Sequence, residues 1–284
     1  MQVKRSRARP LMGTLVAVWA EGETSAVTAG ISRALAAVER VEKRMSYFDP
    51  ESDVSRLNRE AHRCSVLVHP QTFKVLREAQ RLFRLSQGVF DVTVGQVLAR
   101  EGFLPPLVGA IPRGRHSFGD VRMGPGFRVR FRRPLWIDLG GIAKGFAVDQ
   151  ALSALRRSGV KRGGVNAGGD LAFFSDRPEK FWVRHPCQIS KMISLGQGRA
   201  GAVASSAPTY SARGVGGGRV SSPYVFRGQS VTSQKSVTVV ARRALWADAL
   251  TKVVLLAPDQ AGPLLRRFRA EAFVFSSKEK SNGQ

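Results

Sequence analysis

The sequence predicts an α+β protein, with a single mixed domain over residues 1–276 and a polar tail over residues 277–284. Apolar residues recur at helical spacing in some segments and at strand spacing in others. The two kinds of segment do not alternate in a strict β-α-β order, which favours α+β over a parallel α/β architecture. Hydrophobic residues make up 43% of the 284 residues, enough for a sizeable core.

The first half of the chain opens with a strand and two helices. Residues 15–19 are rich in β-branched and aromatic side chains and predict a strand, although the basic start and short apolar run also imitate a secretory signal. Residues 24–45 predict an amphipathic helix, because apolar side chains recur at intervals of three and four. Residues 70–87 predict a second helix, opened by Pro70 and closed by Gly88.

The second half begins with an alternating segment. Over residues 127–138, phenylalanine and valine alternate with arginine at the start, which predicts a strand with one face in water. Residues 142–158 predict a helix that stops at Gly159. The same patterns predict strands near 170–174, 180–184 and 237–242, and a helix over 246–256.

The composition is strongly basic, with a formal net charge of +24 from 45 Lys and Arg against 21 Asp and Glu. Such an excess favours phosphates, nucleic acid or anionic membranes as partners. The basic residues are scattered along the chain, and there is no zinc-finger or RRM-type pattern, so no nucleic-acid binding is expected. Peripheral contact with an anionic membrane stays open, and no apolar run reaches the ~18 residues of a membrane span.

The stretch IDLGGIAKGFAVDQ predicts an anion site between a strand and a helix. Asp138 is placed at the end of the strand, and Gly140 and Gly141 make a turn that lets the backbone approach a ligand closely. The free N–H groups of the following helix and the ammonium group of Lys144 would then face a phosphate. Asp138 would bind a ribose or base group, or help to hold Mg²⁺. The plain alternative is a tight turn without a ligand.

The stretch WADALTKVV predicts a second polar point on the chain. Asp248 begins a helix, and Thr251 and Lys252 follow three and four residues later, on the same helical face. A carboxylate and a hydroxyl that point to one place suit a hard cation. Alternatively, Asp248 is only the cap of its helix.

Six or more motifs in collinear order resemble one family, the ApbE-type FAD:protein FMN transferases, once called thiamine-biosynthesis lipoproteins. They are Met12-Gly13-Thr14, MSYFDPESDVSRLN, GVFDVTVG, IDLGGIAKGFAVD, GVNAGGDLAF, ASSAPTYSARG and ADALTK. The resemblance implies a fold of antiparallel-rich sheet packed with helices. It also implies an enzyme that splits FAD, attaches FMN to a Ser or Thr hydroxyl of an acceptor protein, and releases AMP, with Mg²⁺ as cofactor.

The resemblance assigns roles by position. The flavin pocket would be lined by Met12, Tyr47, Phe90 and Asp91. FAD would also be bound by Asp138 and Lys144, the metal by the Gly141 carbonyl, Asp248 and Thr251, and catalysis would fall to Asp248 and Lys144. No role is assigned to Asp170, which could be a turn residue.

Because Met12 would belong to the flavin pocket, cleavage of a signal after Ala20 would remove part of the site. The resemblance therefore favours a core strand at residues 15–19, and a cytoplasmic location is expected. Only eleven residues precede Met12, too few for the lipoprotein signal of many relatives.

Two positions depart from the family pattern. Relatives usually carry a threonine four residues after the metal-binding aspartate; here that position is Lys252, and Thr251 would stand in for it. An ammonium group beside Mg²⁺ should weaken metal binding unless it leans toward the FAD phosphates, and it could also replace the metal. Ser222 lies near the position of a common histidine.

Two other functions compete with protein flavinylation. A flavin-binding or FAD-hydrolysing relative would share the same pocket without modifying proteins. A basic nucleic-acid-binding protein is less favoured, because nothing beyond the net charge of +24 supports it.

Overall fold

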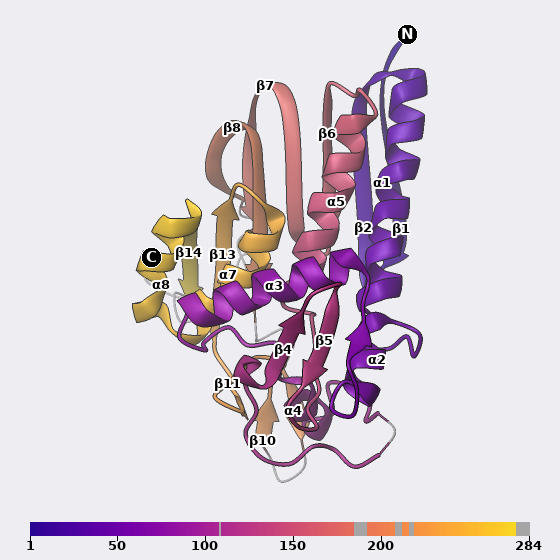
Figure 1. Ribbon diagram of the computed structural model, residues 1–284. Helices are drawn as coiled ribbons and strands as arrows, with labels where there is room; N and C mark the ends of the chain where they lie inside the picture. Colours follow the sequence, from indigo (N-terminus) through magenta and orange to yellow (C-terminus); the bar gives the residue numbers. More distant parts are fainter. Residues whose placement is uncertain (108, 185–191, 208–211, 216–218, 277–284) are drawn as a thin grey trace, which may run out of the picture.

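A computed structural model of the protein describes residues 1–107, 109–184, 192–207, 212–215 and 219–276. The predicted polar tail, residues 277–284, lies outside the described residues. Within the described part, the predicted α+β class is confirmed by an antiparallel sheet with helices packed on it (Figure 1). No helix in these ranges is both long and apolar enough to cross a membrane.

The main sheet has seven strands in the order β1-β2-β6-β7-β8-β13-β14, and every neighbouring pair is antiparallel. Its strands are β1 (Gln2–Leu11), β2 (Thr14–Glu23), β6 (Arg162–Ala167), β7 (Asp170–Arg184), β8 (Met192–Ser206), β13 (Lys235–Ala241) and β14 (Glu271–Ser276). The described residues also form three small sheets. The first has the strand order β3 (Val66–Leu67), β5 (Arg128–Phe131), β4 (Val121–Gly124). The second pairs β9 (Arg213–Val215) with β10 (Arg219–Ser221), and the third pairs β11 (Val225–Phe226) with β12 (Gln229–Ser230).

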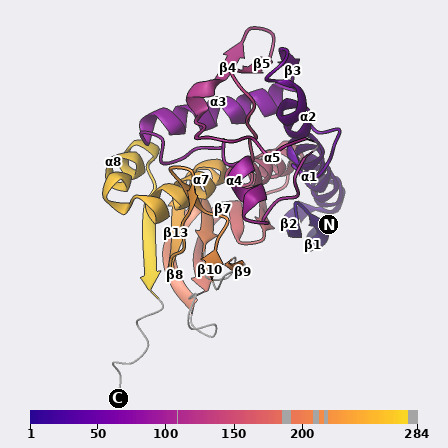
Figure 2. The same ribbon diagram turned by 90° about the horizontal axis from the view of Figure 1, so that it is seen from below.

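Three helices cover one face of the main sheet. They are α1 (Thr24–Met45), α5 (Ala143–Arg157) and α7 (Ala244–Leu256). Figure 2 shows them as a layer against the strands, with α8 (Pro258–Phe268) beside α7. Among the described residues, the other helices are α2 (Asp53–Glu60), α3 (Pro70–Leu85), α4 (Gly95–Arg100) and the short 3₁₀ helix Phe118–Asp120.

Most of the predicted elements are present. The helix predicted over residues 24–45 matches α1, and the strand predicted at residues 15–19 lies within β2. β2 buries Val16, Val18 and Ala20 toward the helices, which is the alternation expected of a half-buried strand. The two short strands predicted near 170–174 and 180–184 are parts of one long strand, β7.

The strand predicted over residues 127–138 is wrong beyond Phe131, where β5 ends. Pro134 cannot donate a backbone hydrogen bond, and the chain to Leu139 is irregular. Side chains distant in sequence replace the missing strand partner. Asn58 accepts from the Ile137 amide at 2.8 Å and donates to its carbonyl at 3.0 Å, while Gln96 accepts from the Trp136 amide at 2.9 Å.

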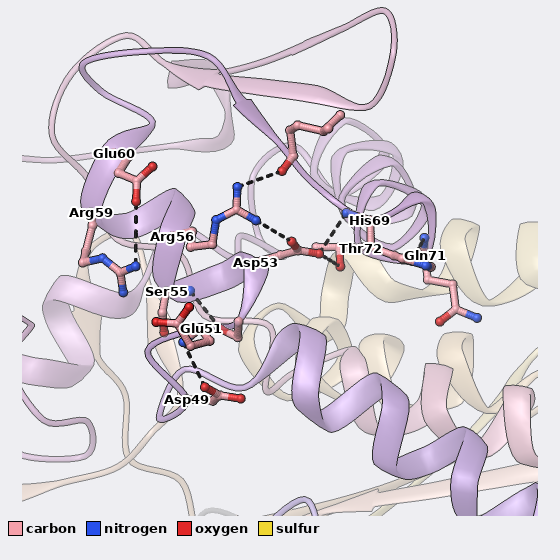
Figure 3. Close-up of polar contacts among 12 residues, drawn as sticks. Asp49, Glu51, Asp53, Ser55, Arg56, Arg59, Glu60, His69, Gln71 and Thr72 are labelled. Carbon is pink, nitrogen blue, oxygen red and sulfur yellow. Dashed lines mark hydrogen bonds and ion pairs between the residues drawn. The ribbon is translucent and has the colours of Figure 1, made fainter.

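Helix α2, which carries Asn58, begins in a polar cluster around Asp53 (Figure 3). Asp53 accepts from the His69 amide at 2.9 Å and from the Thr72 hydroxyl at 2.6 Å, so it fixes α2 against the N-terminus of α3. The Arg56 guanidinium lies 3.5 Å from the same carboxylate. The segment that carries Asp138 is therefore positioned by Asn58 on α2, by Gln96 on α4 and by the Val92 carbonyl, which accepts from the Asp138 amide at 2.8 Å, rather than by a sheet.

Helices α5 and α7 meet at Gly145. A Cβ atom there would lie 2.6 Å from the Ala244 carbonyl carbon and 2.8 Å from the Asp248 Cβ, closer than atoms can pack. The Gly145 amide donates to the Asp248 carboxylate at 3.0 Å, and Asp149 on α5 accepts from the Ala244 amide at the start of α7 at 2.8 Å. Glycine is thus required for this contact, which also brings Asp248 to the N-terminus of α5.

We expect Gly145→Ala to lower the free energy of unfolding by about 3 kcal/mol or more, because the added methyl group must push two backbones apart. Gly262→Ala is the matched control, since its Cβ in α8 would meet only the Arg266 side chain, at 3.7 Å. That change should be neutral or stabilising by up to about 1 kcal/mol. Urea unfolding measures both variants; equal effects would show that the α5–α7 contact does not require glycine.

Candidate active site

A cavity of about 510 Å³ opens where the N-terminus of α5, the end of β8 and α7 meet. Its lining comes from segments far apart in the sequence: Val89 to Val92, Val94, Leu98, Asp138, Gly140, Gly141, Lys144, Gly168, Ser205 to Ala207, Pro223 to Val225, Lys252 and Leu256. A neighbouring cavity of about 440 Å³ shares Asp91 with it and is lined by Arg100, Arg115 and Arg227. The larger cavity thus gathers four of the polar residues that the motifs indicate, namely Asp91, Asp138, Lys144 and Lys252.

Four charged side chains from α5, α7 and the start of β7 interact at one end of this cavity. Asp248 is fully buried and forms an ion pair with Lys252, whose ammonium group also donates to the Asp248 carbonyl at 3.1 Å. Lys144 donates to Asp170 at 2.8 Å, and Asp170 is also buried. Two carboxylates face two ammonium groups, so the side-chain charges of this four-residue cluster sum to zero.

The shifted pKa values follow from burial and from the mutual attraction of these charges. Burial disfavours the charged form of Lys144, but Asp248 and Asp170 outweigh it and raise the pKa of Lys144. Burial disfavours the carboxylate of Asp248 too, yet Lys252 and Lys144 lower its pKa. Burial and the nearby Asp248 raise the pKa of Asp170 to about 6, against the opposing effect of Lys144 and Lys252. Asp248 is therefore the firmly ionised carboxylate of the cluster.

Two backbone amides at the start of α5, where the sequence predicts an anion site, have partners inside the protein. The Ala143 amide donates to the Leu139 carbonyl at 2.8 Å, and the Gly145 amide donates to Asp248. These two donors are already used, so an anion in the cavity would meet the ammonium groups of Lys144 and Lys252. The anion-binding role of the other amides of this turn stays a prediction.

Asp138 lies in the cavity lining with a tight turn after it. Its carboxylate accepts from the Gly140 amide at 3.0 Å, and burial raises its pKa to about 6. Burial, with a smaller contribution from Asp138, also raises the pKa of Tyr47. Tyr47 is buried and donates to the Pro105 carbonyl at 3.3 Å, and it is not among the described residues that line the cavity.

The structure brings only some of the predicted flavin-binding residues to the cavity. Phe90 and Asp91 line it, although Asp91 also accepts hydrogen bonds from Thr93 and from the Phe118 amide at 3.2 Å. Met12 lies in the turn between β1 and β2 with a left-handed φ of 54° and donates its amide to Glu42 at 2.6 Å. It does not belong to the described lining, and its flavin contact stays a prediction.

The predicted metal ligands are arranged around Lys252. Gly141 lines the cavity, and a Cβ atom on it would lie 3.6 Å from Lys252 Cε, so the lysine side chain passes over this turn. Thr251 is fully buried; its hydroxyl bonds to the Asp248 carbonyl at 2.7 Å and to Ser206 at 2.8 Å. Ser222, near the usual histidine position, is buried and donates to the Val231 carbonyl at 2.5 Å.

Three features of the site were not predicted from the sequence. Asp170 follows the paired glycines of GVNAGGD, and an acid directly after a glycine turn could have indicated a site residue. Its partner Lys144 lies 26 residues away, so the pairing itself could not be predicted. Ser206 belongs to the quoted stretch ASSAPT, but only the fold shows that it meets Thr251. Asp149 closes IDLGGIAKGFAVD, and nothing in the sequence indicates that it caps α7.

The described residues do not fit a divalent cation as they stand. Oxygen ligands of the kind that Mg²⁺ prefers are present, but the Asp248 carboxylate is occupied by Lys252 and the Asp170 carboxylate by Lys144. In the described ranges, no group of three or more His, Cys, Asp or Glu side chains could hold a metal. The predicted roles of Gly141, Asp248 and Thr251 as metal ligands thus stay predictions.

The fold and the motifs of this cavity are those of one family. A model of the ApbE family matches residues 12–274, and the chain therefore belongs to the ApbE family. The chain is 29% identical over 143 residues to the FAD:protein FMN transferase of Vibrio cholerae, covering 47% of this chain and 43% of that protein. It is 30% identical over 149 residues to the FAD:protein FMN transferase of Rhodobacter capsulatus, covering 47% and 28%. It thus aligns with less than half the length of these relatives.

Solved structures of the family share the fold over nearly the whole chain. The ApbE protein of Thermotoga maritima is 23% identical with a TM-score of 0.82, and 97% of each chain is covered. The flavin transferase ApbE of Vibrio cholerae is 22% identical with a TM-score of 0.80, covering 97% of this chain and 94% of that one. The antiparallel-rich fold implied by the resemblance is confirmed.

The pKa of Asp138 predicts how Asp138→Asn changes the pH dependence of stability. Since the folded-state pKa is raised to about 6, the stability that Asp138 contributes at low pH is lost as the pH rises through 6. Asparagine does not ionise and can still accept from the Gly140 amide. Relative to wild type, the variant should gain about 2 kcal/mol in unfolding free energy between about pH 4 and pH 7.5. Urea unfolding at both pH values measures this; a constant difference would contradict the burial of an ionised Asp138.

Proposed function

We propose that the protein is an FAD:protein FMN transferase. The observation that carries this proposal is the cavity beside α5, where Lys144 and Lys252 present two ammonium groups at one end and Phe90, Val92 and Leu98 add apolar lining. FAD is divided in a matching way: its doubly charged pyrophosphate suits the ammonium groups, and its flat flavin ring suits the apolar lining. The names of the aligned relatives support the same reaction.

The proposed reaction transfers FMN from FAD to a Ser or Thr hydroxyl of an acceptor protein. The hydroxyl oxygen forms a new bond to the phosphorus on the flavin side of the pyrophosphate, and the bond from that phosphorus to the bridging oxygen breaks. AMP leaves with the bridging oxygen, and the hydroxyl proton is released to solvent. Negative charge grows on the leaving phosphate, so fixed positive groups next to it would lower the barrier.

Within this proposal, the chain's own residues bind and orient the dinucleotide. Lys144 is held by Asp170 and would donate to a phosphate oxygen at the positive end of the cavity. Asp138 and the adjacent turn at Gly140 lie in the same lining and would contact the polar groups of the flavin or ribose. The family resemblance implies Mg²⁺, but no step here is assigned to it, since its carboxylate ligands are paired with lysines.

The activity is tested with purified protein, FAD and a candidate acceptor, with AMP and protein-bound flavin as readouts. FMN bound covalently to the acceptor together with released AMP would support transfer. Free FMN and AMP without labelled protein would favour the FAD-hydrolysing alternative, in which water takes the place of the hydroxyl. No AMP release with several Ser- or Thr-containing acceptors, with or without Mg²⁺, would contradict the proposed function.

Lys144→Met should weaken FAD binding more than riboflavin binding, because riboflavin has no phosphate. Losing one charge-assisted hydrogen bond predicts an increase of about tenfold or more in the Kd of FAD, with little change for riboflavin. Calorimetric titration of both ligands measures this, and Lys74→Met, at an exposed position on α3, is the control. An equal loss for the two ligands would show that Lys144 supports the structure and does not touch phosphate.

A further inference from the structure

We propose that the ammonium group of Lys252 is the resident cation of this site and takes the place of a divalent metal. The first part, that Lys252 and not a metal ion binds the Asp248 carboxylate, rests on geometry alone. The second part, a metal-independent cleavage of FAD, rests on the proposed function. Mn²⁺ binding tests the first part, and AMP release tests the second.

The position of Lys252 follows from its place on α7. It lies one helical turn after Asp248, so its side chain can reach back along the same face. There its ammonium group contacts both the carboxylate and the backbone carbonyl of Asp248, the latter at 3.1 Å. The side chain is only 18% exposed, and its Cε lies 3.6 Å from where a Cβ of Gly141 would be. Lys252 thus lies between Asp248 and the Gly141 turn, the two groups that the family resemblance assigns to the metal.

The other oxygen ligand expected on this helix is engaged elsewhere. The Thr251 hydroxyl is fully buried between the Asp248 carbonyl and the Ser206 hydroxyl, at 2.7 and 2.8 Å. These two hydrogen bonds use its proton and one of its two lone pairs, which leaves at most one lone pair for a metal. Thr251 is therefore a weaker substitute for the threonine that relatives carry at the Lys252 position.

The charges of the cluster lead to the same conclusion. Lys144 pairs with Asp170 and Lys252 pairs with Asp248, so the four side chains are neutral together. A divalent cation would have to enter beside two ammonium groups, and its attraction to the carboxylates would be offset by that repulsion. Without the Lys252 charge, the cluster would carry one net negative charge and would attract a metal.

The ammonium group of Lys252 also suits the role that it would take over. It has three N–H donors, so it can keep its hydrogen bonds to Asp248 and still donate one to a ligand in the cavity that it lines. Lys144 lines the same cavity. Each of the two lysines keeps N–H donors beyond those used by its carboxylate, so both can donate to pyrophosphate oxygens where a metal would otherwise make the contact.

The first test measures metal binding to the flavin-free protein, with Mn²⁺ as the probe. Calorimetry and the electron paramagnetic resonance signal of free Mn²⁺ should detect no stoichiometric site in wild type. Lys252→Thr removes the cation and adds a hydroxyl, so its affinity for Mn²⁺ should rise at least tenfold; Lys252→Met should show a smaller gain. Lys74→Thr, an exposed change on α3, should behave as wild type.

One Mn²⁺ bound per wild-type molecule and lost in Asp248→Asn would overturn the proposal, as would a folded Lys252→Thr variant without a Mn²⁺ site. Circular dichroism establishes whether each variant is folded. Should Lys252→Thr fail to fold, Lys252→Met and the wild-type titration still decide the question.

The second test measures AMP release from FAD, with a candidate acceptor protein present, in a chelator or in excess Mg²⁺. Wild type should release AMP at rates that agree within twofold in the two conditions. Lys252→Thr should be at least tenfold faster with Mg²⁺ than with the chelator. Loss of wild-type activity in the chelator, restored by Mg²⁺, would contradict the proposal. If no sample releases AMP, the proposed function fails, while the Mn²⁺ titrations still determine whether Lys252 excludes a metal.

Discussion

The close contact between α5 and α7 at Gly145 is the constraint on which the site depends. Only a residue without a side chain lets the α5 backbone reach the Ala244 carbonyl and the Asp248 Cβ. The contact is then reinforced in both directions, since Gly145 donates its amide to Asp248 and Asp149 accepts from the first amide of α7. The two helices consequently place Lys144, which lines the cavity, within the electrostatic attraction of the buried Asp248 carboxylate.

This arrangement explains why charged groups can be buried here. A lone carboxylate in the position of Asp248 would be costly, but a backbone amide and Lys252 both satisfy it. Asp170 is compensated by Lys144 in the same way, although burial still raises its pKa to about 6. The cluster is neutral as a whole, and its cations are fixed to rigid helices rather than to loops. Such preorganised positive groups are suited to stabilising a charge that develops during phosphoryl transfer.

Much of the fold could be predicted from local patterns, because α1 and β2 follow apolar periodicity closely. The strand predicted to end at Asp138 could not be corrected from the sequence, since Asn58, 79 residues earlier, supplies the hydrogen bonds that replace it. The motifs predict a site that includes Asp138, Gly141 and Lys144, and the structure places all three in the lining of one cavity. The spacing between Asp248 and Lys252 does not predict where the lysine side chain points, because a lysine one turn after an aspartate can reach either the carboxylate or a ligand. The structure shows that the side chain packs over Gly141 and forms an ion pair with Asp248.

The central claim is that a lysine, and not a metal ion, occupies the cation position of this ApbE-family protein. The most direct measurement is a crystal structure of the FAD complex grown with excess Mn²⁺, with an anomalous difference map collected near the manganese edge. The account predicts that Lys252 Nζ remains within hydrogen-bond distance of Asp248 and that no anomalous peak lies there. A peak coordinated by the Asp248 carboxylate and the Gly141 carbonyl, with Lys252 displaced, would contradict it.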